Sequence, residues 1–295
     1  MAETLSSLVS APWLAERLDD PSIVVLDASK HLPAAGRDPK ADFEKAHIPG
    51  ALFLDLPGLK DTSSSVPDAI PTHSQLATRL AELGIQSDQT IILYDDSALR
   101  SSARAWFTFT AYGFERVAVL DGGLAHWRAL GYAVETGQSA PTPHALREIA
   151  ALAPERVRFK SDMLANIEHA GEQVIDARAA DRVFGDGVDP VHGGPNGRIP
   201  GSLNLPFGAV LNADGTFKSA AELRAAFEKA GLDWQRPVIA SCGSGMTASV
   251  LLFAMHLAGK NDTALYDGSW SEWAADPDTP KAHGPKDDGP MGESA

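Results

Sequence analysis

The strongest constraint on the fold of this 295-residue chain is a set of four short sequence signals that occurs twice. In the same order, four signals of the first half recur in the second: Ile-Val-Val-Leu-Asp27 as Val-Ile-Asp176, Ile-Pro-Gly50 as Ile-Pro-Gly201, Ile-Ile-Leu-Tyr-Asp95 as Val-Ile-Ala-Ser-Cys242, and Asp121-Gly-Gly as Asp267-Gly-Ser. The shift stays between 146 and 151 residues. A shift this regular indicates a duplicated domain, and the length fits two domains of about 120 to 150 residues.

Both halves alternate short apolar runs with helical patterns. We expect strands at 22–27, 90–95, 116–120, 172–177, 236–241 and 263–266, and helices at 74–84, 99–112, 122–130, 219–230, 246–258 and 270–275. Alternation of this kind predicts an α/β fold in which each domain is a parallel sheet with helices on both faces.

The domain boundaries follow from the repeat and from composition. We expect an N-terminal domain at 1–137, a linker at 138–158, a C-terminal domain at 159–280 and a disordered tail at 281–295. The linker contains three prolines. The chain beyond Ala275 is rich in Asp, Pro and Gly, so it has little apolar surface to bury.

Composition excludes several classes of function. A net charge of −14 argues against nucleic acid or an anionic membrane as a partner. The longest apolar run, Ala248 to Leu257, is too short to cross a bilayer. The N-terminal residues lack the features of a signal peptide, so we expect a cytoplasmic location. One cysteine excludes an internal disulfide and zinc sites built from several cysteines, and we expect no metal or cofactor.

The single cysteine, Cys242, lies between a strand expected to end at Ser241 and a helix expected to begin near Thr247. In parallel sheets, ligands bind at the carboxyl ends of strands, where loops lead into helices. Gly243 and Gly245 allow the backbone to curl so that successive N–H groups point inward and form an anion site. We expect this loop to stabilise the Cys242 thiolate and to make it a nucleophile.

The cysteine loop also has features in common with three other kinds of site. A free cysteine is often a small core residue, although packing alone does not require two nearby glycines and a helix start. Asp95 occupies the equivalent position of the first half, where a carboxylate can cap a helix but cannot act as a sulfur nucleophile, so we expect a non-catalytic first domain. A nucleotide P-loop needs a lysine that is absent here, and a cysteine phosphatase needs an arginine where this chain has Ala248.

The duplicated arrangement, the Ile-Pro-Gly signals, the stretch Asp267-Gly-Ser-Trp-Ser-Glu-Trp and the loop Cys242-Gly-Ser-Gly-Met-Thr-Ala resemble the tandem rhodanese-domain sulfurtransferases. The loop is similar to that of 3-mercaptopyruvate sulfurtransferases, whereas thiosulfate sulfurtransferases usually have Cys-Arg-Lys-Gly. Thiosulfate is a compact dianion that favours two cations in the loop, and this loop carries none. The resemblance therefore implies a sulfurtransferase that carries sulfur as a persulfide on Cys242.

The resemblance also implies a set of site residues. Cys242 and Ser244 would be catalytic, and the substrate would be bound by Arg182, Gly243, Ser244, Gly245, Met246 and Thr247. Arg182 would bind the substrate carboxylate, although it could instead pair with Asp181 or Glu172, and Ser244 could be a plain turn residue.

The chain departs from the family pattern at two places. A second substrate-binding arginine would fall near Val191-His192, and neither residue carries a fixed positive charge. Some family members use an aspartate and a histidine of the first domain to assist the serine. Asp55 matches the aspartate, but the histidine position falls on Asp68-Ala69, so we expect this relay to be absent.

Three functions stay open at this point. The first is transfer of sulfur from 3-mercaptopyruvate through the Cys242 persulfide to a thiol such as thioredoxin, or to cyanide, with release of pyruvate. The second is a thiosulfate:cyanide sulfurtransferase. The third is a non-catalytic carrier that holds a persulfide for a partner protein.

Overall fold

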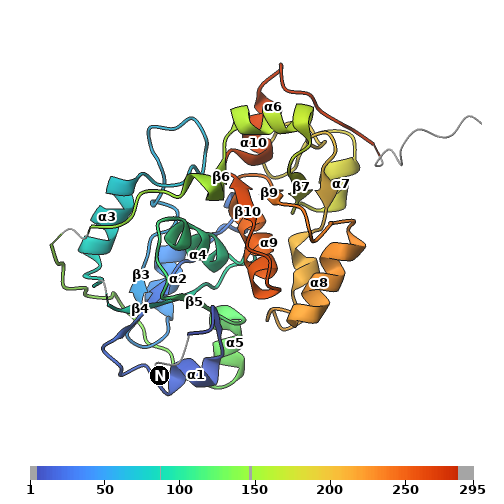
Figure 1. The fold of residues 1–295 in the computed structure, drawn as a ribbon. Helices are drawn as coiled ribbons and strands as arrows, with labels where there is room; N and C mark the ends of the chain where they lie inside the picture. The colour runs from blue at the N-terminus through green and yellow to red at the C-terminus, as the bar shows by residue number, and fades with distance from the viewer. Residues whose placement is uncertain (1–4, 87, 146–147, 285–295) are drawn as a thin grey trace, which may run out of the picture.

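The computed structural model describes residues 5–86, 88–145 and 148–284, which form two similar domains (Figure 1). The first contains β1 (Leu8–Val9), α1 (Ala11–Ala15), β2 (Ile23–Asp27), α2 (Pro39–Lys45), β3 (Leu52–Phe53), α3 (His73–Glu82), β4 (Thr90–Tyr94), α4 (Ser102–Ala111), β5 (Val117–Leu120) and α5 (Gly123–Ala129). The second contains β6 (Val157–Arg158), α6 (Lys160–His169), β7 (Gln173–Asp176), α7 (Ala180–Phe184), β8 (Leu203–Asn204), α8 (Ala220–Lys229), β9 (Val238–Ser241), α9 (Met246–Leu257), β10 (Thr263–Tyr266) and α10 (Ser269–Ala275). Short 3₁₀ turns lie at Pro33–Ala35, Pro154–Arg156 and Phe207–Val210.

Both sheets have five strands, and the paired strands are parallel. Their orders are β1-β5-β4-β2-β3 and β6-β10-β9-β7-β8, which is the same order counted from the first strand of each domain. The α/β prediction and the internal duplication are therefore confirmed. The outer strands β1, β3, β6 and β8 were not predicted, because two residues are too few to show a periodic pattern.

Side chains of the inner strands alternate between two apolar layers. In β4, Ile91 and Leu93 join the core under α3 and α4, whereas Ile92 and Tyr94 join the core under α1, α2 and α5. This alternation follows from the pleat of a strand, which points successive side chains to opposite faces. Each fully buried aliphatic side chain of this kind contributes about 1.5–3 kcal/mol relative to an exposed one.

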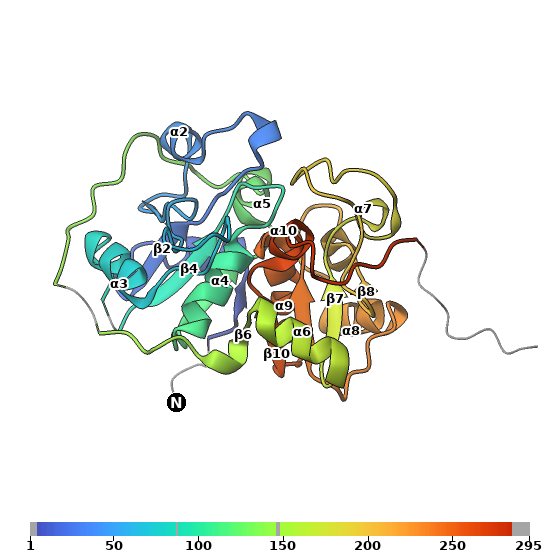
Figure 2. The ribbon, with the colours of Figure 1, turned by 90° about the horizontal axis from the view of Figure 1, so that it is seen from above.

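The two domains share one apolar core. Helices α4 and α9 lie side by side at the centre of the molecule in both views (Figures 1 and 2), and the Trp106 and Phe253 rings meet edge to face with centroids 4.8 Å apart. Helix α9 is buried from Met246 to Met255, as expected for a helix that is apolar on all sides. The start of α9, next to Cys242, is therefore held by packing from both domains.

The proposed linker at 138–158 lies against the first domain. Ile149 is buried, its carbonyl accepts a hydrogen bond from His73 Nε2, and the Ala153 N–H donates to the Ala111 carbonyl at 2.9 Å. The segment then enters the 3₁₀ turn Pro154–Arg156 and the edge strand β6. The connection is consequently fixed to the end of α4 before the second domain begins.

The chain beyond Ala275 has defined partners through residues 276–284, which include the first four residues of the predicted disordered tail at 281–295. Ala282 pairs with Arg198 in an antiparallel bridge, and the Thr279 hydroxyl donates to the Trp273 carbonyl at 2.5 Å. Trp273 Nε1 donates to the Pro280 carbonyl at 2.8 Å. Backbone hydrogen bonds thus order a segment whose composition offers little apolar surface. The remainder of the predicted tail, 285–295, lies outside the described residues.

Within the part of the chain that the structure describes, no helix is long and apolar enough to cross a membrane.

The carboxylates at the ends of β2 and β7 occupy equivalent positions in different electrostatic surroundings. Asp176 is paired with Arg178, whose Nη2 lies 2.7 Å from Oδ2. Asp27 is buried and has Ser29 in place of that arginine, so its Oδ1 accepts only the Ser29 N–H among backbone donors. Burial, with a smaller contribution from the Asp95 carboxylate, raises the pKa of Asp27 to about 6.

We expect Asp27→Asn to gain stability relative to the wild type as the pH rises from about 4 to about 7. A raised carboxyl pKa means that the folded state binds the proton more tightly, so the wild-type free energy of unfolding falls through this window, by up to about 3 kcal/mol. Urea denaturation of both proteins across the window measures the difference, with exposed Glu16→Gln as the control. A pH-independent difference would contradict the raised pKa.

Candidate active site

Cys242 lies directly after β9, which is an inner strand of its sheet, and before α9. Gly245 takes a left-handed conformation with φ of 79°, which turns the chain into the helix and suits a residue without a side chain. The loop residues Cys242 and Ser244 are both buried, with 1% and 7% of their surface exposed. Among the described residues, none accepts a backbone hydrogen bond from the N–H groups of 243–247. The loop therefore holds a row of unused donors beside the thiol.

Residues at the start of α10 form hydrogen bonds with the backbone of the Cys242 loop. The Trp270 N–H donates to the Cys242 carbonyl and the Ser271 N–H to the Gly243 carbonyl, each at 2.9 Å. The Ser271 hydroxyl donates to the same Gly243 carbonyl at 2.6 Å, and the Cys242 N–H donates to the Ser269 hydroxyl. These bonds fix the carbonyl oxygens on the α10 side of the loop and so help to set its curvature.

The first domain contains an equivalent loop, in which Asp95 stands at the position of Cys242. The Asp95 carbonyl accepts the Leu124 N–H at 2.9 Å, as the Cys242 carbonyl accepts that of Trp270. The Asp95 carboxylate accepts the backbone N–H groups of Ser97 and Ser102, at 3.0 and 2.9 Å. As predicted, the carboxylate caps the following helix, α4. The donors that stand free in the second domain are partly occupied here.

His192 packs over the loop at Gly243. A Cβ atom on Gly243 would lie 1.9 Å from His192 Nε2, so only glycine fits beneath the ring. Desolvation of the ring lowers the pKa of His192, and the Arg182 guanidinium acts in the same direction against the opposing effect of Asp189. A lowered pKa favours neutral imidazole, so His192 does not replace the missing arginine as a fixed cation.

Arg182 makes an ion pair with a buried carboxylate. Its Nε and Nη2 donate to Asp189, the latter at 2.8 Å, and neither Asp181 nor Glu172 pairs with its side chain. Asp189 also accepts the N–H groups of Val191 and His192, which ties Arg182 to the segment that covers Gly243. Among the described residues, none accepts a hydrogen bond from Nη1 of this guanidinium, while Nε and Nη2 are directed at Asp189.

Three first-domain residues that the sequence analysis did not assign to the site lie against this loop or its neighbours. The Arg104 guanidinium donates to the Asp267 carboxylate and to the Asp68 carbonyl, both at 2.8 Å. Its Nη1 lies 2.9 Å from the position of a Cβ on Gly245 and has no hydrogen-bond partner among the described residues. Lys30 pairs with the Asp68 carboxylate. One signal was available: Arg104 is the sole charged residue of α4.

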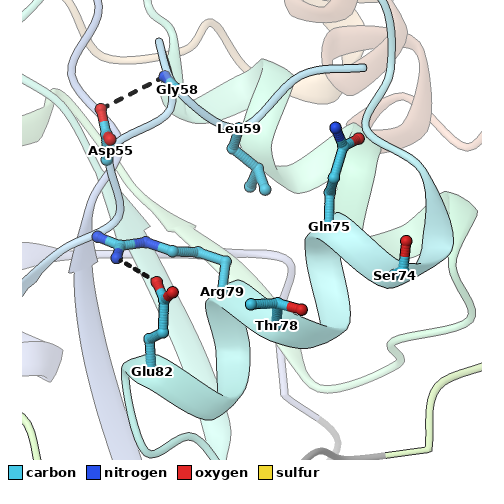
Figure 3. A pocket seen from close by; sticks show the side chains of 8 residues that line it. All are labelled: Asp55, Gly58, Leu59, Ser74, Gln75, Thr78, Arg79 and Glu82. Atoms are coloured by element: carbon cyan, nitrogen blue, oxygen red, sulfur yellow. Dashed lines mark hydrogen bonds and ion pairs between the residues drawn. The ribbon is translucent and has the colours of Figure 1, made fainter. Parts of the chain in front are cut away.

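The relay residue suggested by the resemblance, Asp55, lies elsewhere. Its side chain points to the Gly58 N–H, at 3.3 Å, in a surface pocket of about 330 Å³ beside α3 (Figure 3). Arg79 and Glu82 line the same pocket. The position at which the histidine was expected holds Asp68, whose pKa is lowered mainly by the Lys30 ammonium against the opposing effect of burial, with a smaller lowering from the Ser244 hydroxyl.

Two further arginines of the second domain have structural partners. Arg178 is fully buried, pairs with Asp176 and lies over the Trp270 ring at 4.7 Å. Arg198 lies over the Phe184 ring at 4.9 Å. Three tryptophans are buried within the domains: Trp127, Trp270 and Trp273.

Comparison with known proteins identifies relatives along nearly the whole chain. A family model described as a rhodanese-like domain matches residues 10–130 and 160–276. The chain is 38% identical to the 3-mercaptopyruvate sulfurtransferase of Homo sapiens, covering 90% of this chain and 91% of that protein. It is 36% identical to the thiosulfate sulfurtransferase of Cricetulus griseus, covering 94% and 96%. The crystal structure of SseA, a 3-mercaptopyruvate sulfotransferase from Escherichia coli, matches with a TM-score of 0.80 and 36% identity, covering 91% and 100%.

We expect Asp267→Asn to destabilise the protein by about 3–5 kcal/mol, because it leaves the buried Arg104 charge without its carboxylate. The Asp267 carboxylate also accepts the Ile70 N–H, and an amide can accept at only one of the two sites. The free energy of unfolding from urea titration measures the loss. Glu82→Gln is the control, since its exposed ion pair with Arg79 contributes about 0–1 kcal/mol. Equal, small losses would show that Asp267 does not join the domains.

Proposed function

The chain belongs to the tandem rhodanese-domain sulfurtransferases, and from that premise we propose that it takes sulfur from 3-mercaptopyruvate through a persulfide on Cys242. The observation that carries the proposal is the loop itself: a buried thiol beside unused backbone N–H donors, with no cation in the loop sequence. Such donors stabilise a thiolate and, after transfer, a persulfide anion. The proposed catalytic residues are Cys242 and Ser244.

The reaction is a double displacement. The Cys242 thiolate attacks the sulfur of 3-mercaptopyruvate, a sulfur–sulfur bond forms, and the bond from that sulfur to C3 breaks with its electron pair moving into the enolate of pyruvate. The proton of the donor thiol is transferred to C3, which gives pyruvate and an anionic persulfide. A thiol such as that of reduced thioredoxin, or cyanide, then attacks the outer sulfur and regenerates the thiolate.

Binding of the donor is assigned to two groups. The other edge of the Arg182 guanidinium donates to the carboxylate, since two parallel N–H groups match two carboxylate oxygens. The loop surrounds the reacting sulfur with Gly243, Ser244, Gly245, Met246 and Thr247. Asp189 holds Arg182 in place, so the guanidinium is ordered before the donor arrives.

A thiosulfate donor is the second candidate, and one observation favours it. Arg104 lies against Gly245 of the loop, where it could supply a cation that the loop sequence lacks, and Lys30 pairs with Asp68, whose carbonyl Arg104 also contacts. Each is already paired with a carboxylate, Arg104 with Asp267 and Lys30 with Asp68. The pairing leaves little net positive charge for a dianion, so we favour the monocarboxylate donor.

The test compares pyruvate release from 3-mercaptopyruvate with sulfite release from thiosulfate, each with cyanide as the acceptor. We expect 3-mercaptopyruvate to be preferred and Arg182→Ala to lower its kcat/KM by about 10- to 100-fold, the value of one or two charged hydrogen bonds. Arg224→Ala, which removes an exposed ion pair on α8, serves as the control and should change little. Preference for thiosulfate, or an unaffected Arg182→Ala variant, would overturn the substrate assignment.

Cys242→Ser should abolish transfer with either donor and leave the fold intact, because the exchange is nearly isosteric. The assay is product release together with thermal unfolding of the same sample. Residual activity close to the wild type would exclude Cys242 as the nucleophile. A stable persulfide in the wild type without turnover would instead identify a sulfur carrier.

A further inference from the structure

We propose that residues 276–284, which we call the C-terminal strap, position the Arg182 guanidinium for the donor carboxylate. The strap would thereby set the KM for 3-mercaptopyruvate without contacting the reacting atoms. The inference rests on the proposed function, because it concerns the group that binds the carboxylate in that reaction. Beyond Asp276 the strap lies outside the stretch that matches the rhodanese-like domain.

The C-terminal strap is anchored on the end of α10 and on α6. The Trp273 indole donates to the Pro280 carbonyl at 2.8 Å, and the Thr279 hydroxyl donates to the Trp273 carbonyl at 2.5 Å. The Lys160 ammonium of α6 pairs with the Asp276 carboxylate at 2.7 Å. The strap therefore starts from a fixed position, on the helix that also holds the cysteine loop.

From this anchor the strap runs past α7 (Figure 2) and reaches the residues before the second Ile-Pro-Gly signal. Arg198 and Ala282 exchange both backbone hydrogen bonds of an antiparallel bridge, each at 3.0 Å. Arg198 Nη1 donates to the Gly284 carbonyl at 2.6 Å. A Cβ on Gly197 would lie 3.1 Å from the Ala282 carbonyl oxygen and from atoms of the His283 ring. Both residues before the signal are thus in close contact with the strap.

Gly197 and Arg198 in turn hold α7, the helix that carries Arg182. The Gly197 N–H donates at 3.0 Å to the Arg182 carbonyl, which belongs to the last turn, where helices leave carbonyls without an intrahelical partner. The Arg198 guanidinium lies 4.9 Å from the centroid of the Phe184 ring, also on α7. A helix of five residues has little stability of its own, so the orientation of α7 depends on these contacts.

The Arg182 side chain is connected to Gly197 by a second route. Arg178 Nη2 donates to the Gly197 carbonyl at 2.6 Å, and Arg178 Nη1 lies 3.5 Å from the carboxylate of Asp189. Asp189 is the ionic partner of Arg182. Because N–H···O bonds weaken steeply as their angle falls, a tilt of α7 would weaken both bonds from the guanidinium to the donor carboxylate.

Truncation tests the strap at its bridge. A chain that ends at Pro280 keeps the bonds between the strap and α10 but loses the bridge to Arg198, whereas a chain that ends at Gly284 keeps both and is the matched control. We expect the shorter chain to raise the KM for 3-mercaptopyruvate about 10-fold with kcat within about twofold, the pattern for loss of substrate binding. Removal of sulfur by cyanide from preloaded enzyme should not change, because cyanide has no carboxylate.

Ala282→Pro breaks the bridge in the full-length chain. Proline lacks the N–H that donates to the Arg198 carbonyl, and the rest of the strap stays in place. Ala282→Ser keeps that N–H and is the control. We expect Ala282→Pro to raise the same KM about threefold, with thermal unfolding measured for each variant.

A double variant separates positioning from a general loss of stability. If the strap acts through Arg182, ending the chain at Pro280 has no further effect on KM in the Arg182→Ala background. The inference would be overturned, with the proposed function left standing, by an unchanged KM in the shorter chain or by an equal fall in kcat and sulfur removal. A KM effect that persists in full with Arg182→Ala would overturn it as well. No pyruvate from the wild type would overturn the proposed function itself, and the inference with it.

Discussion

The carboxylate of Asp267 is the interaction on which the arrangement of the site depends. It stands at the end of β10, immediately before the helix that holds the Cys242 loop from behind, and both of its oxygens accept donors from the first domain. The carboxylate thus fixes the first domain to the turn that leads into α10, and the N–H groups of Trp270 and Ser271 in α10 in turn hold the loop. The apolar contact between α4 and α9 brings the domains together, and Asp267 sets their register.

The two domains show how one topology supports different chemistry at equivalent positions. β4 and β9 are the central strands of the two sheets. The residue that follows the central strand is Asp95 in the first domain, and it is Cys242 in the second. The Asp95 carboxylate occupies backbone N–H groups of its own loop, whereas the thiol leaves the corresponding donors unused. At the end of β7, Asp176 pairs with Arg178, whereas Asp27 at the end of β2 has Ser29 in that place, and burial raises the pKa of Asp27.

The sequence was sufficient for the features whose determinants are local. Strand, glycine loop and helix around Cys242 follow one another directly, so their pattern predicts the loop, and the repeat predicts two similar domains, each with a parallel sheet. Arg104 reaches the loop only because the two domains pack against each other, and no local sequence pattern predicts a contact between domains. Arg182 was assigned without its partner, because Asp189 comes from an irregular segment whose position depends on backbone hydrogen bonds.

The ion pair between Arg104 and Asp267 also makes the two duplicated domains depend on each other. A single module of this topology can be copied, lost or joined to other domains without harm as long as its site is self-contained. Here the half without the sulfur nucleophile supplies the buried cation that anchors the other half. Separated into two polypeptides, the halves would form an obligate heterodimer, and their assembly would become a bimolecular process governed by the concentration of each.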